Sequence, residues 1–324
     1  MKYRELGRTG FTISEIGFGA WGIGGMWGPR DDELAARALN RALDIGITFF
    51  DTALAYGDGH SEGLIAKVFK ERKARATIAT KIPPKNGRWP ASYEIPLKDV
   101  FPAQWIRACT ERSLKNLNID CLDLQQFHVW TDTWMGDPDI SALKEECARL
   151  IKEGKVKHFG VSINDHEPDS ALKIVSSGLI DTVQVIYNIF DQSPEKKLFP
   201  LCLKENIGVI VRVPLDEGSL AGTFTKNTKF PPGDWRSDYF KDARLKETVE
   251  RVEKLRPHFE KEGISFPLGA LKFCLSHKSV SVVIPGMRRP EHAETNAQAS
   301  DGKALPQSLL SELKKHSWQR NFYD

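Results

Sequence analysis

The sequence predicts a single (β/α)8 TIM-barrel domain over residues 1–324, and two features of the chain lead to that prediction. Short runs of apolar and β-branched residues alternate with longer amphipathic stretches, as in a parallel sheet with connecting helices. No Pro-, Gly- or Ser-rich linker divides the chain, and α/β barrels of this length occur as one domain. The predicted strands are 15–20, 47–51, 77–82, 122–128, 157–162, 182–188, 208–214 and 280–285.

Helices are predicted between these strands. The first, 31–46, opens on acidic residues and ends on Gly46, which matches the chemistry of helix starts and stops. Before the first strand, residues 3–14 are predicted to form a β-hairpin that plugs the N-terminal mouth of the barrel. The other helices are 62–72, 105–118, 141–154, 194–208, 243–263 and, as an extra C-terminal helix, 306–319.

Composition and charge argue against several classes of function. The net charge of +3 comes from Lys and Arg scattered among Asp and Glu, so no basic stripe indicates a nucleic-acid partner. The N-terminus lacks the apolar segment of a signal peptide, and no apolar run approaches the length of a membrane span. The five cysteines contain no CxxC pair, which indicates neither a metal site nor a disulfide framework. We therefore expect a cytoplasmic protein with buried thiols.

Two long loops interrupt the alternation, 83–101 after the third predicted strand and 215–242 after the seventh. Long loops in compact domains are usually functional. Because both follow strands, we expect both at the carboxyl-terminal face of the barrel, where the active sites of such barrels form.

Gly17, Gly19 and Gly22 match the GxGxxG pattern of dinucleotide-binding folds, with Asp51 at the end of the next strand. In that fold a helix opens within the glycine motif, whereas here the helix starts near Asp31. Asp51 also lies 29 residues beyond Gly22, rather than about 20. We interpret the match as a coincidence, although a small residue such as Gly19 at a strand end lets a ligand come close.

Four polar residues fall at the carboxyl ends of neighbouring predicted strands. Asp51 ends the second strand, and Tyr56 lies in the loop after it. Lys81 is near the end of the third strand, and His128 ends the fourth. Each residue alone also has a purely structural interpretation. Asp51 could cap a turn and Tyr56 could line the barrel wall. Lys81 could reach solvent, and His128 could be a hydrogen-bonded histidine at the barrel rim. Strands lie about 5 Å apart, so the four side chains can converge, and Asp and Lys at apolar strand ends favour a paired arrangement.

The four side chains suit proton transfer to a carbonyl group. An Asp51–Lys81 ion pair would fix the ammonium, which would lower the pKa of Tyr56 from its usual value of about 10. His128 would hydrogen-bond the same substrate oxygen. The set predicts general acid catalysis of a reduction, and it requires a cofactor because no side chain carries hydride.

Residues 46–69 form the stretch "GITFFDTALAYGDGHSEGLIAKVF", which resembles the aldo-keto reductase superfamily. The stretches "ATK", "LQQFH", "LIKEGKVKHFGVS" and "IPGMRRPEHAETNAQA" resemble the same family in the same order, up to about residue 300. The resemblance implies a (β/α)8 barrel with an N-terminal hairpin that reduces aldehydes and ketones with NADPH and needs no metal. It also implies a catalytic tetrad of Asp51, Tyr56, Lys81 and His128, with Tyr56 as the proton donor.

The resemblance also implies a set of contacts to NADPH/NADP. Arg288, together with Arg289 or Arg236, would hold the 2′-phosphate, because guanidinium donors suit that group. Many relatives have Asn where this chain has Ile163, which leaves Asn164 as the substitute contact. Many also have an aromatic ring at the position of Arg212, whose guanidinium plane can stack in its place. The implied contacts are Trp21, Asp51, Ser162, Asn164, Gln184, Arg212, Pro214, Leu215, Gly218, Arg236, Gly286, Arg288, His292 and Asn296.

The expected partner is a small-molecule carbonyl compound. Trp21, Trp89 and Trp130 are predicted to line its pocket, with the alternative that some of these rings only pack beneath loops. Arg320 in the C-terminal tail is interpreted as a structural salt-bridge partner, with contact to an anionic substrate as the alternative. The alternative function is a nucleotide-binding redox sensor or regulatory subunit with little turnover, since the same fold serves as a subunit of potassium channels. The sequence leaves the physiological substrate and the oligomeric state open.

Overall fold

The computed structural model describes residues 1–25 and 30–323 of the chain. Eight parallel strands form one curved sheet in the order β10-β9-β8-β7-β6-β5-β4-β3, so strands that are consecutive in sequence are neighbours in space. Isolated parallel bridges join Ile16 to Val283 and Gly19 to Gly286, which closes the sheet into a barrel. The strands are β3 (Phe18–Gly19), β4 (Phe49–Asp51), β5 (Thr77–Ile82), β6 (Leu122–Trp130), β7 (Val156–Ile163), β8 (Thr182–Ile186), β9 (Gly208–Arg212) and β10 (Val280–Val283).

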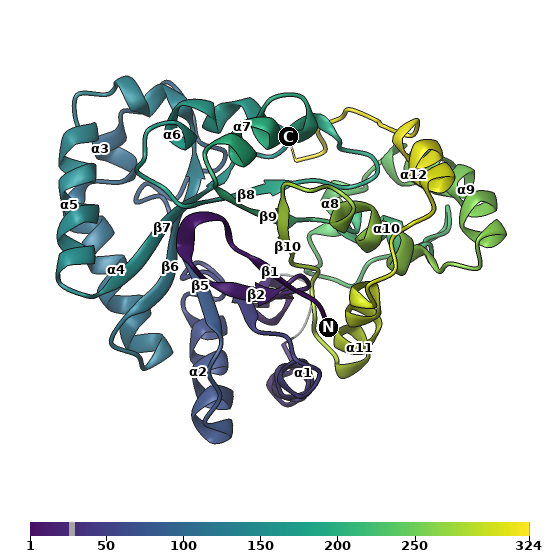
Figure 1. Cartoon of the computed structure of the whole chain (residues 1–324), viewed down its shortest axis with the longest axis horizontal. Helices are drawn as coiled ribbons and strands as arrows, with labels where there is room; N and C mark the ends of the chain where they lie inside the picture. Colours follow the sequence, from purple (N-terminus) through teal and green to yellow (C-terminus); the bar gives the residue numbers. More distant parts are fainter. Residues whose placement is uncertain (26–29, 324) are drawn as a thin grey trace.

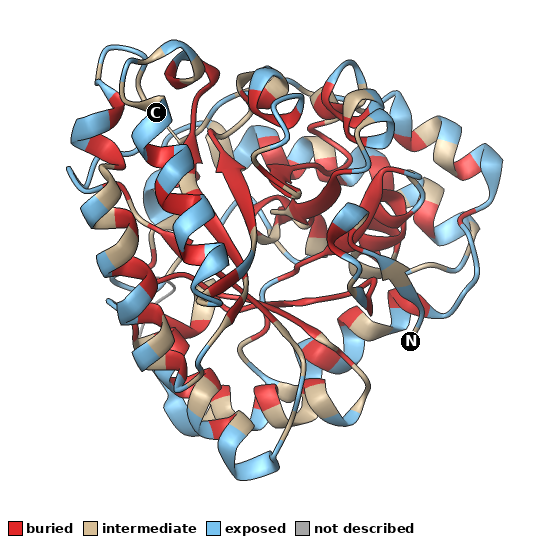
Figure 2. Ribbon diagram, turned by 60° about the vertical axis from the view of Figure 1, so that its left-hand side comes forward, coloured by how far each residue is buried: buried red, intermediate tan, exposed pale blue. Residues whose placement is uncertain are grey.

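Helices cover the outer face of this sheet (Figure 1). Figure 2 shows that the strands are buried, whereas most helices turn one buried side inward and one exposed side outward. Within the described residues, no helix is both long and apolar enough to cross a membrane. The helices are α1 (Asp32–Asp44), α2 (His60–Arg72), α3 (Leu97–Val100), α4 (Ala103–Leu117), α5 (Ile140–Lys152), α6 (Leu172–Val175), α7 (Leu198–Lys204), α8 (Arg236–Tyr239), α9 (Arg244–Lys261), α10 (Phe266–Leu275), α11 (Pro290–Ala297) and α12 (Gln307–Lys314).

Each predicted strand overlaps an observed strand, although 15–20 is reduced to β3, and the predicted barrel is confirmed. The helices were harder to predict than the strands. The sequence does not predict α10, because nearly all of its residues are apolar and buried and no amphipathic period marks it. The predicted helix 194–208 is shorter in the structure, where α7 begins at Leu198.

The predicted N-terminal hairpin is also confirmed, as β1 (Tyr3–Glu5) paired antiparallel with β2 (Thr12–Ser14). It contributes Leu6 and Ile13 to a small apolar cluster separate from the main core. The cluster fills the amino-terminal end of the barrel, because the hairpin packs there against inward-facing residues of the strands and Ile284, just after β10. These are Phe49, Ala79, Leu124, Ile210, Val282 and Ile284.

A polar layer lies on the same strand faces, toward the carboxyl ends. Residues two apart in a strand point to the same side, and two residues beyond the apolar layer come Asp51, Lys81, Gln126 and Arg212. Three of these, Asp51, Lys81 and Gln126, are almost completely buried. The barrel therefore changes from an apolar interior at the hairpin end to a polar interior at the opposite rim.

Candidate active site

A buried ion pair lies at the centre of the polar layer. Lys81 Nζ donates to Asp51 Oδ1 over 2.5 Å and to the carbonyl oxygen of Thr52 over 2.7 Å. The Lys81 and Asp51 side chains are 0% and 3% exposed, so water does not screen their attraction. Burial opposes the charge on Lys81, but the Asp51 carboxylate outweighs it and raises the pKa of Lys81 above its usual value. Lys81 is therefore an ammonium at neutral pH.

Tyr56 reaches this pair from the loop after β4. Lys81 Nζ donates to the Tyr56 hydroxyl oxygen over 3.3 Å and lies 4.9 Å from the centre of its ring. Because the oxygen accepts this bond, its own proton remains available for donation. Burial raises the pKa of Tyr56, and the Lys81 ammonium only partly opposes that rise. This net direction differs from the lowered pKa expected from the sequence, because desolvation of the phenolate outweighs the nearby positive charge.

His128 lies at the same rim, on β6. Its ring centroid is 6.2 Å from that of Tyr56 and 5.9 Å from that of Trp89, both in edge-on arrangements. Burial lowers the pKa of His128 well below its usual value, and the charges of Lys81 and Arg212 add to the effect. The imidazole is therefore neutral and has one N–H to donate. Its Nδ1 atom is buried and has no hydrogen-bond partner among the described residues.

The second carboxylate oxygen of Asp51 accepts hydrogen bonds from two glutamine amides. Gln184 Nε2 donates to Asp51 Oδ2 over 2.7 Å, and Gln126 Nε2 donates to it over 3.3 Å. Gln126 is absent from the site predicted from the sequence. Gln126 could have been predicted from its position in "LQQFH", because residues two apart on a strand share a face and His128 follows two residues later.

Arg212 ends β9 and faces the same space. Its Nη2 atom donates to Asp165 Oδ1 over 2.6 Å and to the carbonyl oxygen of Ile163 over 2.9 Å. Burial opposes its charge, but Asp165 outweighs that effect and raises the pKa of Arg212. The Nε atom is buried and has no partner among the described residues. Arg212 is thus a fixed cation at the rim, on the strand where the resemblance implies a nicotinamide contact.

Asn164 bonds to the 83–101 loop. Its Oδ1 accepts from the Ala91 amide over 2.8 Å, and its Nδ2 donates to the Ala91 carbonyl over 2.9 Å and to Glu167 over 3.0 Å. The side chain therefore helps to fix the loop. Its role as a cofactor contact stays a prediction.

Trp130 is also placed differently from the prediction. It is completely buried and packs against Phe127 and Trp134 in the main core. The pairing of β6 with β7 shifts register between His128 and Trp130, so the two residues do not share a face. The expected pocket wall is therefore reduced to Trp21 and Trp89, of which Trp89 is 47% exposed.

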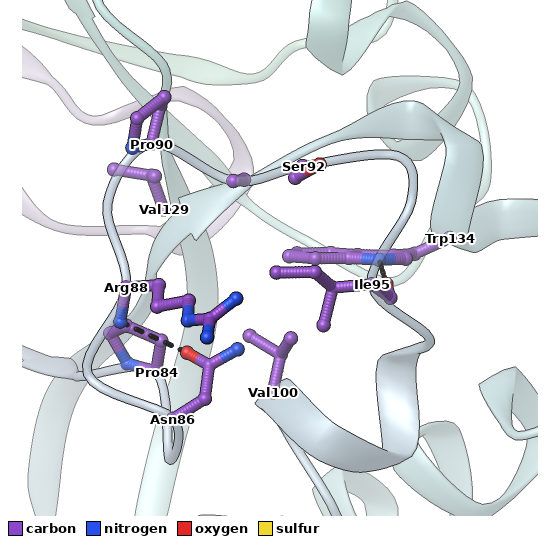
Figure 3. Close-up of a pocket in the computed structure, with 10 residues that line it drawn as sticks. Pro84, Asn86, Arg88, Pro90, Ser92, Ile95, Val100, Val129 and Trp134 are labelled. Atoms are coloured by element: carbon purple, nitrogen blue, oxygen red, sulfur yellow. Dashed lines mark hydrogen bonds between the residues drawn. The ribbon is translucent and has the colours of Figure 1, made fainter.

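The 83–101 loop, with Val129 and Trp134, lines a small cavity of about 10 Å³, which is room for a single water molecule. Figure 3 shows Arg88 and Asn86 on one side of it and Trp134 and Ile95 on the other. Trp134 Nε1 donates to the Ile95 carbonyl over 2.8 Å. Together with the bonds from Asn164, this contact holds the loop, and with it Trp89, in place.

A second group of charged residues joins the 215–242 loop after β9 to the segment after β10. Arg236 forms a two-point ion pair with Asp234, through Nε at 2.9 Å and Nη2 at 2.6 Å. Arg288 is close enough to this pair that its charge adds to that of Arg236 in lowering the pKa of Asp234. Burial and Arg236 in turn lower the pKa of Arg288. Arg288 thus lies in the field of two like charges, Arg236 and Arg289, and of one carboxylate, Asp234.

Small residues and a short loop border this charged group. A Cβ atom at Gly22 would lie 2.7 Å from Arg288 Cδ, so a larger residue there would require the arginine side chain to move. Gly218, with φ of 95°, lies in the loop that carries Pro214 and Leu215. The remaining predicted contacts are at the same side: Gly286 bridges to Gly19, His292 Nδ1 accepts from the Arg288 amide, and Asn296 is buried on α11.

The C-terminal tail is tied to the loop after β9. Arg320 Nη2 donates to both carboxylate oxygens of Asp216 at 2.6 Å, and both side chains are buried. The Tyr323 hydroxyl donates to Glu217 Oε1 over 2.6 Å. Burial raises the pKa of Glu217 to about 7, against the lowering effect of that hydrogen bond. The interpretation of Arg320 as a structural salt-bridge partner is confirmed.

The chain is similar to known proteins in sequence and in structure. The model of the Aldo/keto reductase family matches residues 15–317. The chain belongs to the aldo-keto reductase family. The aldo-keto reductase YhdN of Bacillus subtilis is 31% identical over 309 residues, which cover 91% of this chain and 87% of that protein. The solved glycerol dehydrogenase AKR11B4 of Gluconobacter oxydans is 27% identical, with a TM-score of 0.79 over 97% of this chain and 94% of its own.

Two further aldo-keto reductase relatives differ in the cofactor that their names give. The aldo-keto reductase yakc [NADP(+)] of Schizosaccharomyces pombe is 27% identical over 96% of this chain and 90% of its own. The NADH-specific methylglyoxal reductase of Escherichia coli is 28% identical over 92% of this chain and 93% of its own. Aldo-keto reductases are oxidoreductases that use nicotinamide cofactors, and family membership alone leaves open which of the two this chain prefers.

Proposed function

We propose that this aldo-keto reductase reduces an aldehyde or ketone to the alcohol with NADPH, and that Tyr56 donates the proton. One observation carries the proposal: Lys81 Nζ contacts both Asp51 Oδ1, at 2.5 Å, and the Tyr56 oxygen, at 3.3 Å. A buried ammonium in contact with a phenol stabilises the phenolate that remains after proton donation. Membership of the family supports the same chemistry.

The residues at the rim fit the nicotinamide end of the cofactor. His128 Nδ1 and Arg212 Nε are buried polar atoms without partners in the described part of the chain, which supports a polar ligand between them. We assign Trp21, Ser162, Gln184 and Arg212 to that end. When bound, the cofactor supplies the hydride that no side chain carries.

The charged group formed by Asp234, Arg236 and Arg288 fits the phosphate end. The charges of Arg236 and Arg289 lower the pKa of Arg288, so these guanidinium groups act on one another and a phosphate beside them would be attracted. Gly22 and Gly218 leave space beside the two arginines. We assign the other contacts on this side to Pro214, Leu215, Gly286, His292 and Asn296.

Each side chain of the site then has a separate role in proton transfer. The neutral His128 donates its N–H to the substrate oxygen and orients the carbonyl group. Tyr56 gives its proton to the same oxygen as negative charge develops there, and the phenolate is held by the Lys81 ammonium. Asp51 keeps Lys81 charged and in place, with its other oxygen bound by Gln184 and Gln126. A neutral imidazole and a protonated phenol at pH 7 agree with the pKa directions of both groups.

Replacing Arg288 by alanine is expected to weaken NADPH binding by about 10- to 100-fold, because a hydrogen-bonded charge pair with the 2′-phosphate is lost. NADH lacks that phosphate, so its Kd is expected to stay within about twofold. Fluorescence titration of both cofactors measures the two values. Arg149→Ala, at an arginine of α5 whose side chain is 58% exposed, is the matched control. Equal weakening for NADPH and NADH would show that Arg288 does not read the 2′-phosphate.

Turnover of 4-nitrobenzaldehyde with NADPH, followed by the loss of NADPH absorbance, tests the proposed function. An aromatic aldehyde is chosen because Trp89 is half-exposed beside His128 and offers a flat apolar wall. We expect steady consumption of NADPH that depends on the aldehyde. Tight NADPH binding with no turnover of this or other carbonyl compounds would instead support a nucleotide sensor.

A further inference from the structure

The carboxylate of Asp51 is bound more elaborately than an ion pair with Lys81 requires. Oδ1 accepts from Lys81, and Oδ2 accepts from both Gln184 and Gln126. Gln184 Nε2 also lies 3.4 Å from Gln126 Oε1, so the two amides bond to each other as well as to the acid. All four side chains are buried, so the hydrogen bonds of this network replace the bonds that these groups would make to water.

Gln126 packs closely against the neighbouring strand. A Cβ atom at Gly160 would lie 2.1 Å from Thr182 Oγ1 and 3.2 Å from Gln126 Cγ, so glycine there leaves room for both side chains. On the other side Gln126 is in register with Lys81, so its amide extends over the interior of the barrel beside the ammonium. The Gln126 side chain is therefore held between β5 and β7 with its amide nitrogen directed at Asp51.

Gln184 has two candidate partners, Asp51 and the cofactor. It makes the shorter bond to Asp51 Oδ2 in the structure, 2.7 Å against 3.3 Å for Gln126. It is also the residue that we assign to the nicotinamide carboxamide. If its amide turns to the cofactor, Asp51 Oδ2 loses its shorter bond in a site that water does not reach. A buried acceptor left without a donor destabilises the state in which it occurs.

We propose that Gln126 is a positioning residue that holds Asp51, and through it Lys81, when Gln184 leaves the carboxylate for the cofactor. The inference rests on the proposed function, because it needs a nicotinamide cofactor at the rim. Gln126 touches neither the cofactor nor the substrate in this account. Its contribution is specific to the bound state, since Gln184 already satisfies Oδ2 when no cofactor is present.

This difference between the two states predicts a non-additive pair of substitutions. Gln126→Met keeps the size of the side chain and removes the amide, so releasing Gln184 would leave Oδ2 without a donor. We expect Gln126→Met to weaken NADPH binding about tenfold. In a Gln184→Met background Oδ2 lacks that donor with or without cofactor, so adding Gln126→Met should change the NADPH Kd by less than about twofold.

Fluorescence titration of NADPH with the four proteins of this cycle measures the effect without relying on turnover. Gln125→Met is the matched control, because Gln125 is equally buried on β6 but bonds to Thr110 on the helix-facing side. Circular dichroism melts check that each variant is folded. Should Gln126→Met fail to fold, Gln126→Asn keeps a polar amide but is too short to reach Asp51, and the same weakening is expected.

The outcomes separate this inference from the proposed function. NADPH binding by Gln126→Met within about twofold of the unaltered protein, or equal weakening in both backgrounds, would overturn the role of Gln126. Binding that follows the cycle in a protein with no carbonyl turnover would uphold that role and overturn the reductase proposal. An unaltered protein that does not bind NADPH would overturn both.

Discussion

Replacing Tyr56 by phenylalanine is expected to lower kcat for carbonyl reduction by about 1,000-fold, because the proton donor is lost. The phenyl ring keeps the apolar contacts of Tyr56, so we expect the Kd for NADPH to stay within about twofold. His128 does not replace the missing acid, since its pKa is lowered well below the usual range by burial and by the charges of Lys81 and Arg212. Steady-state kinetics and NADPH titration measure the two quantities separately.

The control for this substitution is Tyr93→Phe, which removes a hydroxyl from an exposed tyrosine of the 83–101 loop. We expect it to behave as the unaltered protein does. If Tyr56→Phe kept more than a tenth of the original kcat, the assignment of Tyr56 as the proton donor would be wrong, and a water molecule or His128 would have to supply the proton.

Replacing Lys81 by methionine is expected to affect both stability and activity. The substitution leaves the Asp51 carboxylate buried without its cation, which typically costs about 3–5 kcal/mol in free energy of unfolding. Lys81 also lowers the pKa of Tyr56. Without Lys81 that pKa rises further, so proton donation becomes harder. We expect kcat to fall by at least about 100-fold. Urea unfolding and steady-state kinetics provide the measurements.

Lys157→Met is the matched control for that experiment. Lys157 also pairs with an aspartate, Asp123, at 2.7 Å, but its side chain is 50% exposed. Such a pair contributes at most about 1 kcal/mol because water screens it. Equal losses of stability in Lys81→Met and Lys157→Met would contradict the account of a desolvated ion pair at the centre of the site.

The fold was largely predictable from the sequence, since each strand of the barrel is a short apolar run with helix-forming residues on either side. The limits of prediction follow from burial. The apolar helix α10 is surrounded by the core on all sides, so it has no polar face to give it a period. The helix in 194–208 was overestimated because its first residues form a separate short turn, η5 (Ser193–Glu195).

The candidate site was predictable where side chains follow the strand period. Asp51, Lys81 and Tyr56 meet as expected, because two of them end neighbouring strands and the third lies in the loop between those strands. Trp130 was misplaced because a register shift after His128 interrupts that period. The bonds between Asn164 and Ala91 could not be predicted, because they join the strand end to a loop distant in sequence.

The pKa of Tyr56 illustrates a different limit. The sequence supplies the charges near Tyr56, but the net direction depends on how far the phenol is removed from water. Burial has the larger effect and raises that pKa. Lys81 limits the rise, and Tyr56 stays protonated. A phenol that remains protonated at pH 7 suits the donor role better than a partly ionised one.

Transfer of deuterium from NADPH labelled at C4 of the nicotinamide tests the central claim most directly. The unaltered protein would be incubated with 4-nitrobenzaldehyde and each of the two stereospecifically labelled forms of NADPH, and the alcohol analysed by mass spectrometry. We predict that one labelled form delivers a single deuterium to the carbinol carbon, and that Tyr56→Phe suppresses the product. Saturated NADPH binding without deuterated alcohol from either form would contradict the account and favour a protein that binds the nucleotide without reducing a carbonyl group.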